Sequence, residues 1–290
     1  MWAMDRVGII TDEVSSDLGE ALDFAALRGL RHVELRAVGK TNLLELDDAQ
    51  IAQIGAAIAD RGLVVSCIAS PVFKCALSAE RSVAAGDRFG ERDGDVAHHR
   101  QLLRRAADVA MRLGTTRIRI FAFWRERDPD AHEAEIVGHL REAADFAEAR
   151  GLRLLLENEP ACNGGFADEV ARLARAVNSP ALSVVWDPGN EAFAGRPAFA
   201  QGYDAVRDLL THVHLKDVVQ NDDGSRRFAP IGQGVVNYRA QLQALCDDGY
   251  DGWLTLEPHL GASAPAGADV AATVDGLFAI LRSIEPGASR

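Results

Sequence analysis

The sequence lacks the features of a membrane protein, a nucleic-acid binder or a disulfide-rich secreted protein. No run approaches the roughly 18–20 apolar residues of a membrane span, and the first residues carry no signal-peptide pattern. Lysine and arginine form no cluster long enough to neutralise a series of phosphates. We therefore expect a cytoplasmic protein with no membrane or nucleic-acid partner. The cysteines form no Cys-x-x-Cys pair, and we expect inert, buried thiols at Cys67, Cys75, Cys162 and Cys246.

The composition that remains is that of an ordinary globular protein. The chain has 290 residues, of which 48% are apolar and 6% aromatic, and 31 basic against 43 acidic residues give a formal charge of −12. The length suits two domains of about 150 residues or one α/β barrel of about 250 residues with insertions. The acidic excess fits a solvated surface, or a surface plus a few buried carboxylates that hold a metal cation. The positions of the carboxylates decide between these readings.

Short apolar or β-branched runs alternate with segments of helical spacing along the chain. Helical spacing is seen at Leu18, Leu22 and Ala25, and again at Ile51, Ile54 and Ile58. Eight strands are predicted: Arg6 to Thr11, His32 to Arg36, Leu63 to Ala69, Arg117 to Phe121, Arg153 to Glu157, Leu182 to Asp187, His212 to Asp217 and Trp253 to Glu257.

The central strands are too apolar to have one solvent-facing side, which is typical of a parallel sheet wrapped by helices. A doubly wound sheet would need a glycine-rich turn after the first strand, and Thr11-Asp12-Glu13-Val14 is no such turn. We predict one domain over residues 1–290, an α/β protein of the single (β/α)8 TIM-barrel class with extended loops at the C-terminal face. The connections 70–95, 188–203 and 218–236 leave strand C-termini, and 70–95 and 218–236 are the expected lid elements.

Four of the predicted strands end in a potential metal ligand, namely Glu157, Asp187, His214 and Glu257. A single carboxylate at such a position is often only a helix cap. Three buried carboxylates and an imidazole at equivalent positions repel or remain unpaired unless a cation joins them. The pattern therefore predicts a divalent metal site. Mn²⁺ is our first choice, with Mg²⁺, Co²⁺, Fe²⁺ and Zn²⁺ as alternatives.

Two further residues of the seventh predicted strand share a face with His214. His212 lies one layer deeper and is expected to be a hydrogen-bonded partner or core histidine rather than a ligand. Lys216 lies nearer the strand end, where it could pair either with a substrate oxyanion or with a neighbouring carboxylate.

The motifs at these strand ends resemble the xylose isomerase-like barrel superfamily of sugar isomerases and epimerases. They are Leu156-Glu157-Asn158, Trp186-Asp187-Pro188-Gly189-Asn190, His212-Val213-His214-Leu215-Lys216-Asp217, Ile231-Gly232-Gln233-Gly234 and Leu256-Glu257-Pro258. The resemblance implies that Glu157, Asp187, His214 and Glu257 bind one divalent metal. It also implies that Glu157 and Glu257 are the catalytic residues that move protons on opposite faces of the substrate.

The endonuclease branch of that superfamily uses additional histidines that this sequence does not have. Asn190 stands where one of them would be, and Arg226-Arg227-Phe228 replaces another motif. A single-metal site for a small, sugar-like molecule is therefore expected. Candidate substrate contacts, each of which could instead be a cap or a surface charge, are Glu34, Arg36, Lys74, Trp124, Arg125, Glu159, Asn190, His212 and Lys216.

Four functions are considered for this sequence. The leading one is a metal-dependent isomerase or epimerase of a sugar, polyol or keto-sugar derivative, which abstracts a proton beside a metal-bound carbonyl. The second is a lyase that dehydrates an inosose-like or dehydroshikimate-like substrate from the same enolate. A non-catalytic sugar-binding barrel and an endonuclease are less favoured. Helices exposed on the barrel wall could also form a symmetric homo-oligomer.

Overall fold

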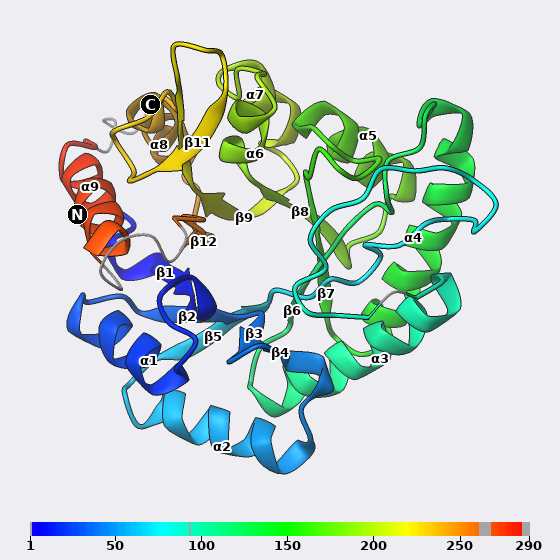
Figure 1. Ribbon diagram of the computed structural model, residues 1–290, viewed down its shortest axis with the longest axis horizontal. Coiled ribbons are helices and arrows are strands. Elements are labelled where there is room, and N and C mark those ends of the chain that lie inside the picture. The colour runs from blue at the N-terminus through cyan, green and yellow to red at the C-terminus, as the bar shows by residue number, and fades with distance from the viewer. Residues whose placement is uncertain (1, 93, 261–267, 286–290) are drawn as a thin grey trace.

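The chain folds into a closed barrel of eight parallel strands surrounded by helices (Figure 1). The computed structural model describes residues 2–92, 94–260 and 268–285. The barrel order is β1-β12-β9-β8-β7-β6-β5-β2. The prediction of a (β/α)8 TIM barrel is therefore confirmed. Its strands are β1 (Val7–Ile10), β2 (His32–Leu35), β5 (Val64–Ile68), β6 (Arg117–Ile120), β7 (Arg153–Glu157), β8 (Leu182–Trp186), β9 (Leu210–Leu215) and β12 (Trp253–Leu256).

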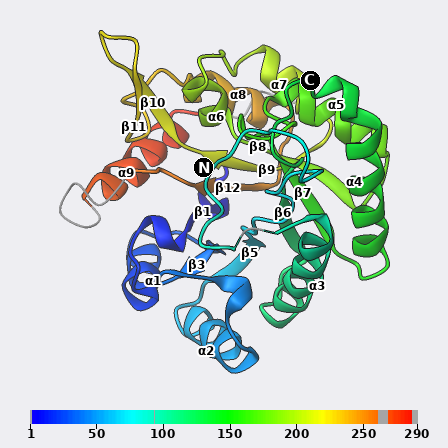
Figure 2. The same ribbon diagram turned by 45° about the vertical axis from the view of Figure 1, so that its right-hand side comes forward.

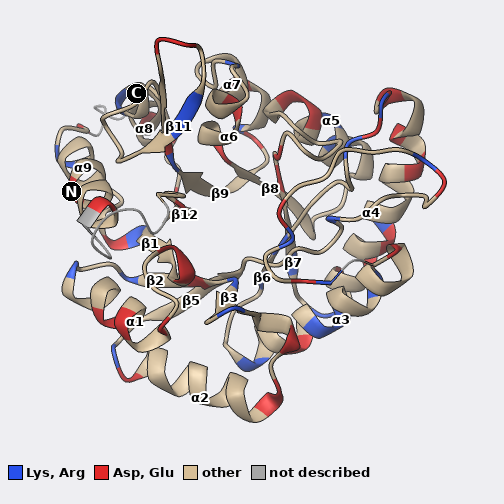
Figure 3. Ribbon diagram, in the orientation of Figure 1, with Lys and Arg blue, Asp and Glu red and all other residues tan. Residues whose placement is uncertain are grey.

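The helices form the outer layer, and their apolar faces follow the predicted spacing. In α2, for example, Ile51, Ile54 and Ile58 are buried, and a capping box between Asp47 and Gln50 starts the helix. Acidic and basic residues are interspersed along these outer helices (Figure 3). The helices are α1 (Leu18–Leu27), α2 (Asp48–Ala59), α3 (Val96–Arg112), α4 (Glu133–Glu148), α5 (Ala167–Val177), α6 (Pro188–Phe193), α7 (Gln201–Val206), α8 (Tyr238–Asp247) and α9 (Ala268–Arg282).

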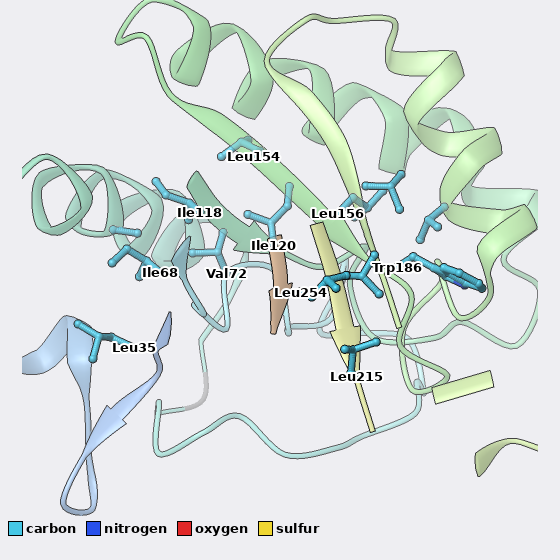
Figure 4. Packing of buried hydrophobic residues seen from close by; sticks show 14 of the residues in the cluster. Leu35, Ile68, Val72, Ile118, Ile120, Leu154, Leu156, Trp186, Leu215 and Leu254 are labelled. Carbon is cyan, nitrogen blue, oxygen red and sulfur yellow. The ribbon is translucent and has the colours of Figure 1, made fainter. Parts of the chain in front are cut away.

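Alternate residues of each strand face either the helices or the barrel interior. Leu154 and Leu156 of β7 belong to the large core between strands and helices, part of which Figure 4 shows. Leu155 belongs instead to a small separate cluster with Cys67 and Val185. Because strand side chains alternate, Glu157 faces the interior on the same side as Leu155. The local sequence of β7 therefore aims this carboxylate into the barrel.

The predicted long connections are partly structured. Residues 188–203 contain α6 and the start of α7, and residues 218–236 contain most of an antiparallel hairpin of β10 (Asp217–Gln220) and β11 (Arg226–Ala229), which projects from the barrel (Figure 2). A second hairpin, β3 (Ala37–Val38) with β4 (Thr41–Asn42), follows β2. Four 3-10 turns complete the elements: η1 (Met4–Arg6), η2 (Thr11–Glu13), η3 (Leu43–Glu45) and η4 (Asp130–His132).

The predicted end of the seventh strand is wrong. The sequence assigns His212 to Asp217 to a barrel strand, but β9 ends at Leu215 and Asp217 begins the β10 hairpin. The reason is that the Asp217 carboxylate accepts backbone hydrogen bonds from Gly232, Gly234 and Val236, which lie in the following loop. Asp217 thus anchors the hairpin and does not extend the barrel.

In the described part of the chain, no helix is both long and apolar enough to cross a membrane. The four cysteines are free thiols, three of them buried and Cys246 partly exposed.

Candidate metal centre

Four neighbouring strands bring the predicted ligands together at one end of the barrel. Glu157 is the last residue of β7, Asp187 directly follows β8, His214 lies in β9 and Glu257 directly follows β12. These strands are consecutive in the barrel (Figure 1). One ligand atom from each residue lies within 4.8 Å of the others, and all four side chains are buried.

Basic side chains surround these carboxylates. His214 Nδ1 lies 3.0 Å from Glu157 Oε1 and 3.3 Å from Glu257 Oε2. Arg119 lies 3.1 Å from Glu157 and 3.4 Å from Glu257. Lys216 Nζ lies 2.8 Å from Asp187 Oδ2 and 2.9 Å from Glu257 Oε2. Burial lowers the pKa of Lys216, but these carboxylates outweigh burial and raise it, so that Lys216 stays charged.

The donor set fits a hard divalent cation. Two glutamates, one aspartate and one imidazole offer mainly oxygen ligands. Burial raises the pKa of Asp187 to about 6 in spite of Lys216, and Asp187 Oδ2 accepts no well-formed hydrogen bond from the described residues, although the Lys216 ammonium lies close to it. A buried oxygen left in this state is a ready ligand for a cation.

Asparagine side chains lock the ends of β7 and β8 together. Asn158 accepts a hydrogen bond from the Asp187 backbone N–H and donates one to the Asp187 carbonyl. Asn190 donates its amide to the Asn158 carbonyl, and its backbone N–H donates to Asp187 Oδ1. We expected Asn190 to contact the substrate, and in this structure its amide is bonded to protein backbone. Asp187 is both the cap of α6 and a member of the carboxylate cluster.

A cavity of about 120 Å³ opens beside the cluster. Lys74 and Glu159 form its far side, with Lys74 Nζ 3.2 Å from Glu159 Oε2. The Lys74 ammonium also lies 4.3 Å from the centre of the Phe89 ring and 4.4 Å from that of Phe121. The cavity is lined by Lys74, Gly86, Asp87, Phe89, Arg119, Glu157, Glu159, Lys216, Glu257 and His259.

Three other candidates are engaged in contacts with the protein. Arg36 reaches Glu257 at 3.0 Å but also forms ion pairs with Asp12 and Glu13. The Trp124 ring packs with Phe121 and Cys162 behind the cavity wall and is not part of its lining. The Arg125 guanidinium forms a bidentate pair with Glu169 at 2.8 Å.

Glu34 does not lie where a substrate contact was expected, whereas His212 lies at the expected depth. We expected Glu34 to contact the substrate, but it lies one layer below Arg36, is fully buried, and contacts His212 and His214. His212 is also fully buried, at the deeper level that its place two residues before His214 predicts. Neither side chain lines the cavity.

Sequence reasoning missed three of the residues that shape the site: Arg119, Phe89 and His259. Arg119 had a detectable signal, because Arg117-Ile118-Arg119-Ile120 is a buried strand and a cation within it must find anionic partners. Phe89 and His259 lie in loops, where no periodicity indicates direction.

A comparison with known families now identifies the fold family. The sequence model of the family described as xylose isomerase-like TIM barrel matches residues 22–277 of this chain. The chain belongs to this family. The resemblance seen in the strand-end motifs is thereby confirmed.

Proteins of similar sequence include enzymes of two kinds, dehydratases and epimerases. An uncharacterised protein of Methanocaldococcus jannaschii is 31% identical over 122 residues, 41% of each chain. The inosose dehydratase of Geobacillus thermodenitrificans is 24% identical over 136 residues, 42% of this chain and 45% of that one. The fructoselysine 3-epimerase of Escherichia coli O157:H7 is 27% identical over 135 residues, which are 44% of this chain and 46% of that one. The chain thus spans less than half the length of these curated relatives.

Solved structures of similar fold extend over nearly the whole chain. The IolI protein with a bound zinc atom has a TM-score of 0.76 at 15% identity and covers 97% of this chain and 99% of its own. A xylose isomerase-like barrel of Mycobacterium smegmatis in complex with magnesium has a TM-score of 0.68 at 20% identity. The match covers 91% of this chain and 87% of that chain. The D-allulose 3-epimerase of Methylomonas sp. in complex with D-allulose has a TM-score of 0.71 at 18% identity, and the match covers 97% of each chain. At these identities the likeness concerns the fold alone.

Proposed function

We propose that this protein is a metal-dependent isomerase or epimerase of a sugar, polyol or keto-sugar derivative. Glu157, Asp187, His214 and Glu257 would hold one divalent ion, Mn²⁺ first and Mg²⁺, Co²⁺, Fe²⁺ or Zn²⁺ as alternatives. The observation that carries the proposal is the placement of two glutamates around His214 at the wall of one cavity. Relatives that are sugar epimerases support the same class of reaction.

Glu157, Asp187, His214 and Glu257 would hold the ion, which when bound would supply Lewis-acid activation of a substrate carbonyl and so acidify the neighbouring C–H bond. Glu157 and Glu257 would move the proton of that bond. Both are held by Arg119 and His214 from the protein side, and both reach the cavity. Each can act as a base toward a carbon placed between them, and the other returns a proton to the opposite face.

The cations at the cavity wall would stabilise the negative oxygen that develops when the proton leaves. Lys216 and Arg119 are both buried and both line the cavity. A fixed ammonium or guanidinium in a dry site stabilises an oxyanion more strongly than water does. Lys216 is therefore the substrate contact that we place nearest the reacting atoms.

The Lys74–Glu159 pair would bind hydroxyl groups at the other end of the substrate. Lys74 has three N–H donors, and among the described residues its hydrogen-bond acceptor is Glu159. Both residues line the cavity, so a donor and an acceptor are presented together, as polyols require. Arg36, Asn190, His212 and Trp124 would support the site from behind, through the contacts described above.

Loop 70–95 would exclude water from the reaction. Gly86, Asp87 and Phe89 of this connection line the cavity, and the Phe89 ring lies against both Lys74 and Arg119. The loop therefore forms one wall of the site, in agreement with a lid role. The β10–β11 hairpin adds Phe228, whose ring lies 5.0 Å from that of His259.

The test is exchange of the substrate C–H hydrogen with deuterated solvent, followed by NMR over a panel of ketoses and inososes with added Mn²⁺. We expect Glu157→Gln and Glu257→Gln each to lower exchange by about 10² or more, the usual size of a general-base contribution. Glu126→Gln, a buried glutamate paired with Arg81 outside the cavity lining, is the matched control. Unchanged exchange in both glutamate variants would overturn the mechanism.

A dehydratase is the second candidate, because several of the relatives are inosose dehydratases. It shares the first proton abstraction and then expels a β-hydroxyl group instead of accepting a proton. Product mass separates the two reactions. Loss of one water supports the dehydratase, and an unchanged mass supports the isomerase or epimerase.

A further inference from the structure

Glu34 is a completely buried carboxylate that joins two histidines in the middle of the barrel. Its Oε1 lies 2.5 Å from His212 Nε2, and its Oε2 lies 3.2 Å from His214 Nε2. All three side chains are buried, with exposed fractions of at most 1%. Glu34 belongs to β2 and the histidines to β9, and β1 and β12 separate these strands in the barrel (Figure 1). The contact therefore crosses the barrel interior.

A carboxylate in this environment is stable only if both oxygens are satisfied. Each histidine turns its Nε2 toward one oxygen of Glu34, so both oxygens have a partner. His212 Nε2 also lies 2.9 Å from the Thr255 hydroxyl oxygen, Oγ1.

The two nitrogens of His214 face different partners. Nε2 is directed to Glu34, whereas Nδ1 lies 3.0 Å from Glu157 and 3.3 Å from Glu257. Because carboxylates accept hydrogen bonds, each nitrogen can donate to the carboxylate that it faces. A cation held among Glu157, Asp187 and Glu257 would take the place of the hydrogen at Nδ1, while Nε2 would keep its hydrogen bond to Glu34.

From this geometry we infer that Glu34 is a positioning residue: it fixes His214 as an Nδ1 ligand, and His212 holds Glu34 in place from the opposite side. The inference rests on the metal centre of the proposed function. A carboxylate behind a ligating histidine fixes the tautomer and the ring orientation and increases the basicity of the ligand. Because Glu34 occupies Nε2 of His214, Nδ1 is the nitrogen of His214 that would bind a metal.

The same three residues could in principle ligate a second ion themselves, because their donor atoms also lie close together. Glu34 Oε2 lies at a hydrogen-bond distance of 3.2 Å from His214 Nε2, and each oxygen of Glu34 already has a histidine nitrogen as its partner. We therefore assign the group to positioning, and metal stoichiometry tests the assignment.

The first experiment uses the unmodified protein, labelled with ¹⁵N-histidine and loaded with diamagnetic Mg²⁺ or Zn²⁺. Long-range ¹H–¹⁵N correlation spectra report which ring nitrogen is protonated, and the His214→Asn variant assigns the signal. We expect His214 to be protonated at Nε2 and metal-bound at Nδ1, with one ion per chain. Metal at Nε2, or a second ion that broadens or shifts His212, would overturn the inference.

The second experiment measures Mn²⁺ affinity by calorimetry in Glu34→Gln. We expect affinity to fall about 10- to 100-fold, the usual effect of removing such a partner. The matched control is Glu91→Gln, another buried glutamate bonded to a histidine, His98, but outside the cavity lining; its affinity should equal that of the unmodified protein. Affinity within twofold in Glu34→Gln would overturn the role of Glu34.

Failure of the Glu34 inference and failure of the proposed function give different results. A protein that binds one Mn²⁺ through His214 Nδ1 but exchanges no substrate hydrogen supports the Glu34 inference and overturns the proposed function. A protein that exchanges hydrogen with its metal at Nε2 does the reverse. If Glu34→Gln does not fold, the spectra of the unmodified protein still decide the inference.

Discussion

Lys216 and Asp187 form a buried ion pair at the mouth of the barrel, with 2.8 Å between the ammonium nitrogen and Oδ2. The ammonium also lies 2.9 Å from Glu257, so it contacts two of the four candidate metal ligands. A divalent cation bound by the same oxygens would lie close to a like charge, and like charges in a dry site repel strongly. We therefore expect Lys216 to oppose metal binding, although in the proposed reaction it would stabilise the oxyanion.

Lys216→Met should separate these two effects. We expect Mn²⁺ affinity to rise about tenfold, because a like charge is removed, and turnover to fall about 10²-fold, because the oxyanion loses its cation. Calorimetry and steady-state kinetics measure the two quantities, with Lys216→Arg as the variant that keeps the charge. A decrease in Mn²⁺ affinity would show that Lys216 instead organises the ligands.

Addition of metal should stabilise the protein. At a Mn²⁺ concentration about 100 times the dissociation constant, the free energy of unfolding should rise by about 2.7 kcal/mol, which raises the melting temperature by several degrees. Differential scanning fluorimetry after dialysis against EDTA measures this, and Asp187→Asn should abolish most of the shift. If no divalent ion binds or stabilises the protein, a non-catalytic sugar-binding barrel becomes the better interpretation.

The Lys74–Glu159 pair should govern substrate binding more than chemistry. Lys74→Met removes the charge at nearly constant side-chain length, and we expect KM to rise about tenfold with a smaller change in kcat. Glu159→Gln keeps the shape of its partner and should show the same pattern. A fall in kcat alone, with KM unchanged, would contradict a role in binding the remote end of the substrate.

Glu191 should make stability depend on pH. This buried glutamate accepts hydrogen bonds from the Ala167 backbone and from Trp186 Nε1, and burial raises its pKa from 4.5 to about 7. Between pH 4.5 and 7 the unfolded chain has already lost the proton that the folded protein keeps. Stability therefore falls as pH rises through this window, by roughly 3 kcal/mol at most, and stays low above pH 7.

Urea unfolding at pH 5 and pH 8 measures this effect. The loss between the two pH values should be smaller in Glu191→Gln, which has no proton to release. Glu148→Gln, at an exposed position of α4, is the control and should follow the unmodified protein. Equal losses in all three proteins would mean that Glu191 titrates in its ordinary range.

The sequence alone was sufficient for the barrel and for the four candidate ligands. Leu154, Leu155 and Leu156 followed by Glu157 define a buried strand with a carboxylate at its end, and three later strands repeat the arrangement. Parallel strands in a barrel must bring their C-terminal ends to one face. Side chains at equivalent strand ends therefore converge, whatever the details of packing, and a local pattern is enough to find them.

The tertiary structure decided which partners these ligands have. Glu34 and Arg36 are two residues apart and look alike as candidates, but one lies deep between two histidines and the other reaches Glu257. Arg119 meets Glu157 and Glu257, whereas Arg125 pairs with Glu169 on the outside. Depth inside the barrel and the path of loop 70–95 depend on contacts between segments far apart in the chain. No local periodicity encodes those contacts, so the charges around the site became known only from the folded chain.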